Sequence, residues 1–274
     1  MRTFRFIGMV LFAILLCMNF ASCSSNDNAP TEENEEGEVV VSGKKLAKIV
    51  GKLADGAYSE TYTFNYDSKG RLIEATEIEE KGSYKYTDIY QLIWGDDAIK
   101  VIENGFSSDS NSNYTDSYII TLNNGLIQNI GNDDTFTYNK SNRFVSTTNG
   151  YSYTTTTIWD GDKLVSISDA REGDGGDATL TYEKSCKKGY FPFIANMIGG
   201  FDCISLCVAH PEIAGMRTVQ LPSSVTWTEK NYYTGQYESS TSTLAYEFDK
   251  EGYISMVRSK DGEGSLWTYT LTWE

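Results

Sequence analysis

From Leu46 onward, apolar and polar residues alternate along most of the chain with a period of two. Neighbouring side chains of a β-strand point to opposite faces, so this alternation predicts strands with one buried face. In residues 61–66, TYTFNY, the aromatic side chains share one face, and in residues 267–273, WTYTLTW, apolar residues alternate with threonines. The pattern predicts strands that bury aromatic and aliphatic side chains and expose threonines to water.

A similar turn separates the predicted strands at six places. An aromatic or aliphatic residue is followed by Asp, Asn or Gly, then by a short polar stretch and an apolar residue. Asp or Asn caps such a turn through its side chain, and Gly supplies a positive φ. The six turns are Tyr66 followed by DSKGRL, Trp94 by GDDAIKV, Leu122 by NNGLI, Tyr138 by NKSNRF, Trp159 by DGDKLV and Phe248 by DKEGYI. Their unequal spacing predicts consecutive hairpins of variable length.

These hairpins predict a single all-β domain over residues 44–274, an antiparallel up-and-down meander. Such a meander exposes two strand edges unless it curls, so we expect a barrel or a strongly rolled sheet. The composition agrees, because 24 glycines, only four prolines and 13% aromatic residues favour strands and turns over helices. The pattern does not distinguish a closed barrel from an open rolled sheet.

The alternation stops between Tyr182 and Thr218, which indicates an insertion. The residues near 191–216 predict one or two short helices, with Asp202 as an N-cap.

The N-terminus has the features of an export signal. Arg2 and Arg5 precede an apolar run over residues 6–20, which is shorter than the roughly 20 apolar residues of a membrane-spanning helix. The next residues complete the string FASC, ending at Cys23, which resembles a bacterial lipobox. We therefore predict a signal peptide over residues 1–22 and lipidation of Cys23, whose acyl chains would hold the protein on a membrane. A plain secretory signal with a chance cysteine is the alternative.

An acidic, flexible tether is predicted to follow over residues 23–43. The stretch from Ser24 to Glu38 carries six acidic residues, no basic residue and no large apolar residue, so it cannot join a core. Ser24 stands where enterobacterial lipoproteins retained in the inner membrane carry Asp, so the lipoprotein resemblance implies the outer membrane. The sequence leaves the periplasmic face and the cell surface both open.

The turns YDSKGRL and FDKEGYI resemble the tyrosine-aspartate hairpin repeats of bacterial surface proteins. With the lipobox, the acidic tether and the interrupted meander, they are similar to a Bacteroides-type outer-membrane lipoprotein family of unknown function with a porin-like fold. This resemblance covers most of residues 44–274 and implies a fold, but no activity. The alternation itself argues against a true porin, because Thr, Ser, Lys and Glu face outward where lipid would require an apolar band.

Three cysteines and the single histidine lie in or near the insertion. Cys203, Cys207 and His210 follow the helical spacing i, i+4 and i+7, with Cys186 upstream, so a Cys₃His zinc set can be written. We predict no metal site, because exported proteins rarely use zinc–thiolate sites and no CxxC pair is present. Burial of the thiols on an apolar helix face is an alternative. A disulfide from Cys186 to Cys203 or Cys207 is favoured over one within the helix, where the geometry is poor.

Charge and missing motifs exclude several functions. A net charge of -15 and a pI near 4.5 exclude a general nucleic-acid binder. The sequence contains no G-x-S-x-G elbow, phosphate loop, HExxH pair or dinucleotide fingerprint, so we predict a protein that is not an enzyme and has no cofactor. We also expect it to be a monomer. Residues 172–177, EGDGGD, could fold around calcium, but a solvated hairpin loop is favoured because no full calcium-loop pattern is present.

Aromatic residues supply the main functional candidates. Tyr232, Tyr233 and Tyr237 surround Gly235, an arrangement suited to stacking on sugar rings or holding an extended peptide, although they could also pack on their own sheet. We predict a non-catalytic binding module for a polysaccharide or other extended polar ligand. An interaction lipoprotein that binds another envelope protein is the alternative. A glycoside-processing enzyme comes third, because 38 acidic residues make carboxylate pairs plentiful.

Overall fold

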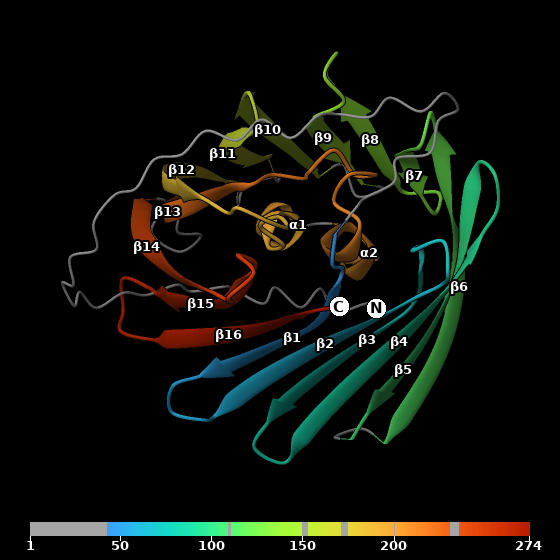
Figure 1. Ribbon diagram of the computed structural model, residues 1–274, viewed down its shortest axis with the longest axis horizontal. Coiled ribbons are helices and arrows are strands. Elements are labelled where there is room, and N and C mark those ends of the chain that lie inside the picture. The colour runs from blue at the N-terminus through green and yellow to red at the C-terminus, as the bar shows by residue number, and fades with distance from the viewer. Residues whose placement is uncertain (1–42, 109–110, 150–152, 171–174, 200, 231–235) are drawn as a thin grey trace.

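The computed structural model describes residues 43–108, 111–149, 153–170, 175–199, 201–230 and 236–274. Sixteen strands in these residues form a closed barrel, in which each strand pairs antiparallel with the next and β1 pairs with β16 (Figure 1). The predicted all-β meander is thereby confirmed, and it is closed rather than open. The strands are β1 (Leu46–Leu53), β2 (Tyr58–Tyr66), β3 (Leu72–Lys81), β4 (Tyr84–Trp94), β5 (Ala98–Ser107), β6 (Ser112–Asn123), β7 (Leu126–Ile130), β8 (Asp134–Tyr138), β9 (Phe144–Thr148), β10 (Thr154–Asp160), β11 (Lys163–Ala170), β12 (Gly176–Ser185), β13 (Gln220–Lys230), β14 (Tyr237–Phe248), β15 (Ile254–Lys260) and β16 (Leu266–Trp273).

The insertion between β12 and β13 fills part of the barrel. Its helices α1 (Ile194–Ile198) and α2 (Ile204–Ala209) lie inside the ring of strands (Figure 1). Aromatic contacts join the insertion to different sides of the barrel, with ring centroids 4.9–5.2 Å apart, in the pairs Phe193–Tyr269, Phe201–Phe136 and Tyr190–Trp273. We call residues 186–219 the plug, because they give the strands an apolar core that a hollow barrel would lack.

The predicted N-cap of the second helix is wrong by one residue. Cys203 occupies the cap position with a φ of 57°, and no side chain caps the helix. The backbone N–H of Asp202 instead donates to Asp134 Oδ2 on β8, at 3.2 Å. This contact holds the Asp202 backbone against β8, and the following residue, Cys203, adopts the left-handed conformation that begins the helix.

The turn chemistry predicted from the sequence is present at three hairpins. In each turn the Oδ1 atom of the first residue accepts hydrogen bonds of 2.9–3.0 Å from the backbone N–H groups two and four positions later, and the fourth residue has a positive φ. The first residues are Asp67, Asn139 and Asp249, and the fourth are Gly70, Asn142 and Gly252. Side-chain capping and left-handed residues therefore close these hairpins.

The aromatic residue at or near the end of an even-numbered strand forms a second repeated contact. Its hydroxyl or indole N–H donates to a backbone carbonyl near the start of the preceding strand, at 2.6–2.8 Å. We call these contacts aromatic latches. β6 ends instead in a Leu122-Asn123 pair, and Leu has no polar hydrogen to donate. The latches are Tyr66 to Leu46, Trp94 to Leu72, Tyr138 to Ile127, Trp159 to Phe144, Tyr182 to Leu164, Tyr246 to Pro222 and Trp273 to Ile254.

The latches define the two ends of the barrel. The latch end carries these aromatic residues, both links to the plug and the pairing of Lys45 with Glu274, whose backbone groups exchange hydrogen bonds of 2.6 and 2.8 Å. Lysine and arginine side chains lie over aromatic rings there, as Lys45 does over Tyr66 and Arg143 over Trp159. The opposite end, which we call the far end, carries the connections after β1, β3 and β5.

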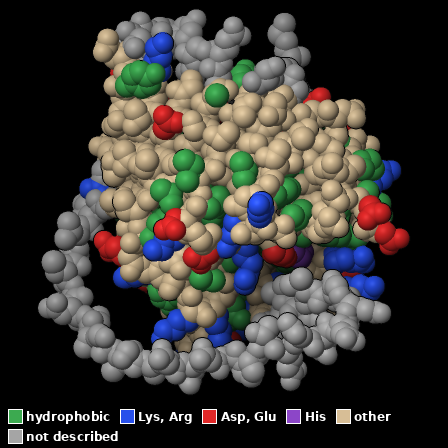
Figure 2. All heavy atoms as spheres, turned by 90° about the horizontal axis from the view of Figure 1, so that it is seen from above, with side chains coloured by type: hydrophobic (Ala, Val, Ile, Leu, Met, Phe, Trp, Pro, Cys, Tyr) green, Lys and Arg blue, Asp and Glu red, His purple; other side chains and the backbone are tan. Residues whose placement is uncertain are grey.

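The outer surface of the barrel is rich in hydroxyl groups. Outward-facing Ser and Thr side chains on neighbouring strands contact one another at 2.7–2.9 Å, in the pairs Thr226–Thr241, Thr228–Ser239, Thr181–Ser224 and Thr137–Ser146. Figure 2 shows one face on which uncharged polar side chains and backbone predominate, with hydrophobic side chains scattered among them. Among the described residues, no helix combines the length and the hydrophobicity needed to cross a membrane.

Candidate functional site

Acidic side chains face one another across neighbouring strands in the far half of the barrel. Glu60 on β2 lies opposite Glu79 on β3, and Glu77 lies opposite Asp88 on β4. On the next hairpin, Glu103 lies opposite Asp116. The alternation places these residues on the face that carries the core residues of the same strands, and like charges directly opposite each other destabilise a sheet. We call these six residues, with Tyr62, Tyr86, Tyr114 and Tyr269, the acidic–tyrosine cluster.

Glu60 is the most buried carboxylate of the cluster, with 3% of its surface exposed. Tyr62 Oη lies 3.5 Å from its Oε2, whereas its Oε1 is buried and has no hydrogen-bond partner among the described residues. Burial, followed by the charge of Glu79, raises the pKa of Glu60 to about 7, although the phenols of Tyr269 and Tyr62 partly oppose this shift. The site thus contains a carboxylate that is both desolvated and incompletely paired.

Gly51 on β1 makes room for this carboxylate. A Cβ atom at Gly51 would lie 2.7 Å from the Tyr269 ring and 2.8 Å from Cγ of Glu60. The side chains of Glu60 and Tyr269 therefore lie over β1 at Gly51, the position where β1 has no side chain. Any larger residue at position 51 would displace one of them.

Glu77 joins the cluster to the plug. The hydroxyl of Ser205 on α2 donates to its Oε1. Burial is the main cause of a pKa of about 8 for Glu77; the charges of Asp88, Glu60 and Glu79 also act to raise it, and the hydrogen bond from Ser205 opposes them. The start of α2 therefore contacts the cluster on the side that faces the latch end.

Tyr114 connects two further carboxylates of the cluster, Asp88 and Glu103. Its Oη lies 2.8 Å from Asp88 Oδ1, 2.5 Å from Glu103 Oε1 and 3.0 Å from the hydroxyl of Tyr86. The two phenols supply only two protons for these three contacts, so the third contact needs a proton on a carboxyl group. Burial raises the pKa of Glu103, which makes it the better holder of that proton.

An aromatic wall borders Glu60 on its other side. The rings of Trp267 and Tyr269 on β16 are stacked, with centroids 5.7 Å apart and planes 10° apart. The ring of Tyr58 packs edge-on against Trp267 at 5.3 Å. Stacked aromatic faces beside carboxylates can bind sugar rings or organic cations.

Of the three tyrosines predicted to bind a ligand, one lies outside the acidic–tyrosine cluster, and the other two fall outside the described residues. Tyr237 is 71% exposed at the start of β14, opposite Lys230 and in register with the outward-facing Ser239. It therefore lies at the far end but does not face the cluster. Tyr232, Tyr233 and the lipidation site Cys23 fall outside the described residues.

The cysteines and the histidine of the insertion are buried in the plug. Cys186, Cys203 and Cys207 are free thiols, and burial raises the pKa of Cys203 to about 12. The disulfide stays a prediction. Within the described part of the chain, no three His, Cys, Asp or Glu side chains are grouped so that they could hold a metal ion. His210 instead joins the plug to β3, because its Nε2 accepts from the N–H of Leu72 at 3.1 Å.

The architecture is similar to that of solved structures. A porin-like protein from Bacteroides uniformis ATCC 8492 matches 84% of this chain and 98% of its own, with a TM-score of 0.55 and 16% identity. This chain has a porin-like fold. A second porin-like protein, from Bacteroides vulgatus ATCC 8482, matches 84% of this chain and 99% of its own with a TM-score of 0.42 and 9% identity. No family profile and no curated protein matches the sequence.

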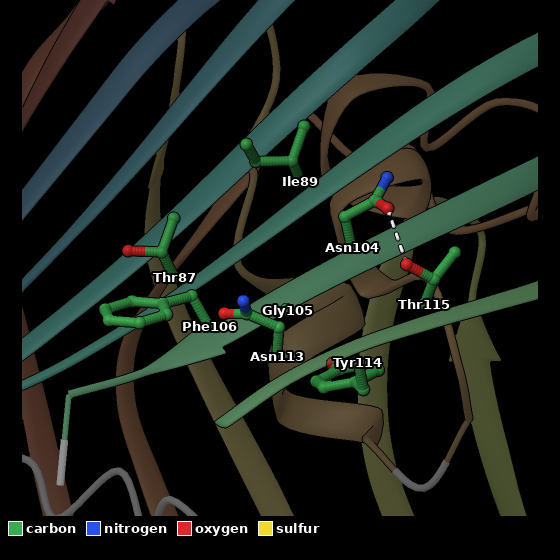
Figure 3. A pocket seen from close by; sticks show the side chains of 8 residues that line it. All are labelled: Thr87, Ile89, Asn104, Gly105, Phe106, Asn113, Tyr114 and Thr115. Carbon is green, nitrogen blue, oxygen red and sulfur yellow. Dashed lines mark hydrogen bonds between the residues drawn. The ribbon is translucent and has the colours of Figure 1, made fainter. Parts of the chain in front are cut away.

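The porin-like barrel also has a shallow hollow on its outer surface. It has a volume of about 310 Å³ and lies over β4, β5 and β6 (Figure 3). Its apolar side chains are Ile89 and Phe106, and its polar ones include Asn104, which accepts a hydrogen bond from Thr115 at 2.9 Å. Such a surface suits contact with another protein better than recognition of a small molecule.

The acidic–tyrosine cluster of this porin-like fold was missed by sequence reasoning, although the alternation carries a signal for it. Tyr58, Glu60, Tyr62 and Phe64 fall on one face of one strand, so an acidic residue interrupts an aromatic row. The same interruption recurs at Asp88, between Tyr86 and Tyr90. Acidic residues at the inward-facing positions of several consecutive strands would have indicated a barrel interior with charged side chains.

Proposed function

We propose that this protein is an exported, non-enzymatic envelope lipoprotein that binds a polysaccharide or another extended polar ligand without altering it. In this proposal Cys23 carries the lipid, and the far end of the barrel carries the ligand. The binding surface consists of the acidic–tyrosine cluster and the aromatic wall beside it. Tyr232 and Tyr233 belong in sequence to the connection between β13 and β14, and Tyr237 begins β14, so in this proposal they would add a second contact with the ligand, separate from the cluster that Tyr237 does not face.

The observation that carries this proposal is the position of Glu60 against Trp267 and Tyr269. A buried carboxylate oxygen without a partner costs free energy, and a ligand hydroxyl or ammonium group would satisfy it. The stacked rings next to it provide the flat apolar surface on which a sugar ring packs. A carboxylate that accepts hydrogen bonds and, beside it, aromatic rings that stack together suit the binding of an extended polar ligand.

The outer surface supports a protein that is held at a membrane by an anchor rather than by its strands. Lys48, Lys52 and Lys100 lie on outward positions of β1 and β5, and Arg258 pairs with Glu247 at 2.6 Å on the outside of β14 and β15. Charged side chains facing lipid are destabilising near the middle of a bilayer. The proposal therefore places the barrel in water next to the membrane. Replacing Cys23 by Ala should then abolish acyl labelling and release the protein from membrane fractions.

Glycan binding tests the proposal directly. The fragment 44–274 contains every described strand, and its first and last strands close the barrel, so it can be studied as a unit. We expect it to bind at least one glycan on an array, with a dissociation constant in the roughly micromolar to millimolar range, because ordering an extended ligand costs entropy. Failure to bind any glycan or other extended polar ligand would refute the proposal.

Variants locate the binding surface. Trp267→Leu should weaken binding of the selected glycan at least tenfold in calorimetry, since it removes one of the two stacked rings. Phe248→Ala is the control, because Phe248 is an exposed aromatic residue at the latch end. The combined Tyr232→Ala, Tyr233→Ala and Tyr237→Ala variant measures what the loop adds. Unchanged binding in Trp267→Leu would remove the aromatic wall from the site.

A second candidate function is contact with another envelope protein, and the outer hollow favours it. Ile89 and Phe106 present apolar surface there, and Phe106 is 39% exposed. Cross-linking in envelope fractions with a photoreactive residue in place of Asn113, which also lines the hollow, tests this candidate. A discrete cross-linked product that disappears in Phe106→Ser would support it.

The raised pKa values of Glu60 and Glu77 also suit a general acid, which a glycoside hydrolase requires. The glycan experiment therefore includes a measurement of newly formed reducing ends. Their formation in the parent but not in Glu60→Gln or Glu77→Gln would replace the binding module by a hydrolase.

A further inference from the structure

We propose that the latch end of the barrel binds directly to the surface of a membrane that contains anionic lipids. The far end, with the acidic–tyrosine cluster, would then face away from the membrane. This inference goes beyond the proposed function, because it concerns contacts of the barrel itself and needs no acyl chain on Cys23. Two independent features of the latch end carry it, an apolar rim and a basic surface.

The apolar rim consists of exposed aliphatic side chains in the half of the barrel next to the latch end. Six large aliphatic side chains are exposed among the described residues, and Leu266 is the one of them that lies at the far end. The other five are 38–64% exposed and lie in the latch half of their strands. These five, which we call the apolar rim, are Ile73, Ile93, Ile119, Ile158 and Val165.

Strand register places four of these side chains close to the turns. Ile93 and Ile158 each directly precede a latch tryptophan whose ring packs against the core, so the alternation turns both isoleucines outward. Ile73 and Val165 are the extra residues where the pairing registers of β3 and β11 shift by one. All four are one or two residues from a strand end, which is within about 7 Å of the turns at about 3.3 Å per residue. Protein segments that lie on a membrane bury their apolar face to a similar depth, roughly 5–10 Å.

The basic surface is formed by the segments outside the strands at the latch end. In sequence these segments, the plug included, contain ten Lys and Arg beside nine Asp and Glu, whereas the connections at the far end contain one basic and seven acidic residues. The latch end thus escapes the negative charge of a chain whose net charge is -15. In Figure 2 most of the visible Lys and Arg side chains lie in the lower half, together with the single histidine of the plug.

Most of these ten basic side chains are available to an outside anion. Among the described residues, only Lys44 and Arg71 of the ten form an ion pair with a carboxylate. Lys45 and Arg143 donate to backbone carbonyl groups and lie over aromatic latch rings. Exposed ammonium and guanidinium groups bind lipid phosphates. The remaining six are exposed, and they are Lys69, Lys140, Lys187, Lys188, Arg217 and Lys250.

Several carboxylates at this end are bound within the protein, so they oppose an anionic surface less. Asp67 and Asp249 accept hydrogen bonds from backbone N–H groups of their own turns, and Glu212 contacts the imidazole of His210. Asp96 and Asp97 are the acidic exception, and both belong to the connection between β4 and β5. The basic surface therefore consists of the N-terminal segment, the plug and the turns after β2, β8 and β14.

The described chain begins at the latch end, which fits this orientation. Lys45 exchanges backbone hydrogen bonds with Glu274 just before β1, so the preceding residues join the barrel at this end. In the proposed lipoprotein, acyl chains on Cys23 therefore bring the latch end toward the membrane. The latch aromatics, with Lys and Arg side chains over them, match the aromatic and basic residues that are enriched where proteins meet lipid headgroups.

Vesicle binding by fragment 44–274 tests the inference, since this fragment lacks Cys23 and can bind only through the barrel. We expect it to sediment with vesicles of equal parts phosphatidylglycerol and phosphatidylethanolamine, and at least fivefold less with vesicles of phosphatidylcholine alone. Sodium chloride at about 0.5 M should weaken the binding, because salt screens the basic groups. Absence of binding to the anionic vesicles would overturn the inference. Binding that is lost in the longer fragment 24–274 would also overturn it, because the acidic segment would then cover the basic surface in place of lipid.

Substitutions in the apolar rim locate the apolar contact. The double variant Ile93→Thr and Ile158→Thr should weaken vesicle binding at least tenfold, because it removes the two most exposed side chains of the rim. Phe106→Thr with Leu266→Thr is the matched control, since it removes two exposed apolar side chains from the far half. Equal weakening in both double variants would indicate adsorption without a preferred end and would overturn the inference.

Substitutions of lysine test the basic surface in the same way. Lys69→Gln with Lys140→Gln should weaken vesicle binding at least threefold, because each lysine near an anionic surface contributes to the attraction. Lys52→Gln with Lys85→Gln is the control, since these two exposed lysines lie in the far half of β1 and β4. A loss of the same size in the control would show that only the total charge matters and would overturn the inference.

A fluorescent label reports which end meets the membrane. An environment-sensitive dye is attached to the cysteine of Ser141→Cys in the turn after β8, or of Ser83→Cys in the far-end turn after β3; both sites are exposed, and the thiols of the plug are buried. We expect anionic vesicles to shift the emission to the blue only in Ser141→Cys. An equal shift in both, or a shift only in Ser83→Cys, overturns the inference. Glycan binding should be unchanged in the Ile93 and Ile158 variant, so failure of this inference leaves the proposed function untouched.

Discussion

Tyr138 Oη donates a hydrogen bond of 2.6 Å to the carbonyl oxygen of Ile127, across the pairing of β8 with β7. This is one of the aromatic latches that join neighbouring strands at one end of the barrel. It explains why Tyr or Trp precedes the Asp or Asn of so many turns. The aromatic ring covers the core, its polar hydrogen satisfies a backbone carbonyl, and the acidic or amide residue after it closes the turn.

Removing one latch should cost a small, measurable amount of stability. Tyr138→Phe keeps the ring but leaves the Ile127 carbonyl without this donor, so we expect the free energy of unfolding to fall by about 1 kcal/mol. Chemical denaturation of fragment 44–274 measures the change. Tyr237→Phe is the control, because Tyr237 is exposed and forms no latch. An unchanged stability in Tyr138→Phe would show that water replaces the latch without cost.

Most of the fold could be predicted from the sequence because its determinants are local. Period-two alternation predicts the strands, and residues such as Asp67 and Gly70 predict the turns through contacts within five residues. Closure could not be predicted, because it depends on the pairing of Leu46 with Trp273, which are far apart in sequence. The latches were missed for the same reason, since each joins two residues 11 to 24 positions apart.

The candidate site was harder to predict than the fold. Glu60, Glu77 and Asp88 become neighbours only when register sets them opposite or diagonal to one another on adjacent strands. The tyrosines proposed from the sequence were chosen for local density around Gly235. Tyr237, the one of them that the structure describes, faces away from the carboxylates. Register, which no short segment specifies alone, therefore decides the chemistry of the barrel interior.

Stability should fall as the pH rises, because Glu77 is held protonated in the folded state. Its pKa is about 8 in the fold against an ordinary value of 4.5, so the folded protein binds more protons than the unfolded chain between these values. Its neighbours are Glu60 and Glu79 on β2 and β3, Asp88 on β4, and Ser205 and Cys203 on the plug. Stability is then greatest below about pH 4.5 for this group and is lost progressively toward pH 8.

Glu77→Gln should remove much of that dependence. One unit of pKa shift corresponds to about 1.4 kcal/mol, so we expect the parent to lose about 2–4 kcal/mol between pH 5 and pH 8 through this group, and the variant to lose clearly less. Denaturation curves at several pH values measure the slope. Glu74→Gln, on the outer face of the same strand, is the control. A parent that is more stable at pH 8 than at pH 5 would contradict the prediction.

Gly105 should be required for the position of Tyr114. A Cβ atom at Gly105 would lie 1.9 Å from the Tyr114 ring and 2.7 Å from Asp88 Oδ1, so Gly105→Ala forces the ring and its hydroxyl out of the cluster. We expect a loss of about 1–3 kcal/mol of stability. The double variant with Tyr114→Ala is the control. The alanine at position 105 should cost less there, because the ring it meets is gone. Equal costs in the two backgrounds would mean that the ring is not what excludes a side chain.

His210 should hold the plug to the barrel wall. Its Nε2 accepts from the buried N–H of Leu72, so the imidazole is neutral with its proton on Nδ1, which donates to Glu212 Oε1 at 2.7 Å. The ring also packs edge-on against Tyr66 and Trp94, with centroids 5.7 and 5.9 Å away. His210→Ala leaves the Leu72 N–H without an acceptor and opens space between two latch residues, so we expect a loss of about 2–4 kcal/mol.

Glu212→Gln provides the matched comparison for this last prediction. Its amide oxygen can still accept from Nδ1 of His210, so the variant should lose less than about 1 kcal/mol. Hydrogen exchange at the Leu72 amide reports the contact itself, because opening of the plug exposes that N–H to water. We expect faster exchange there in His210→Ala than in Glu212→Gln, with little change at amides of the distant β10 and β11. Exchange that rises equally over the whole barrel would instead show that His210 stabilises the fold globally and does not act as a local attachment of the plug.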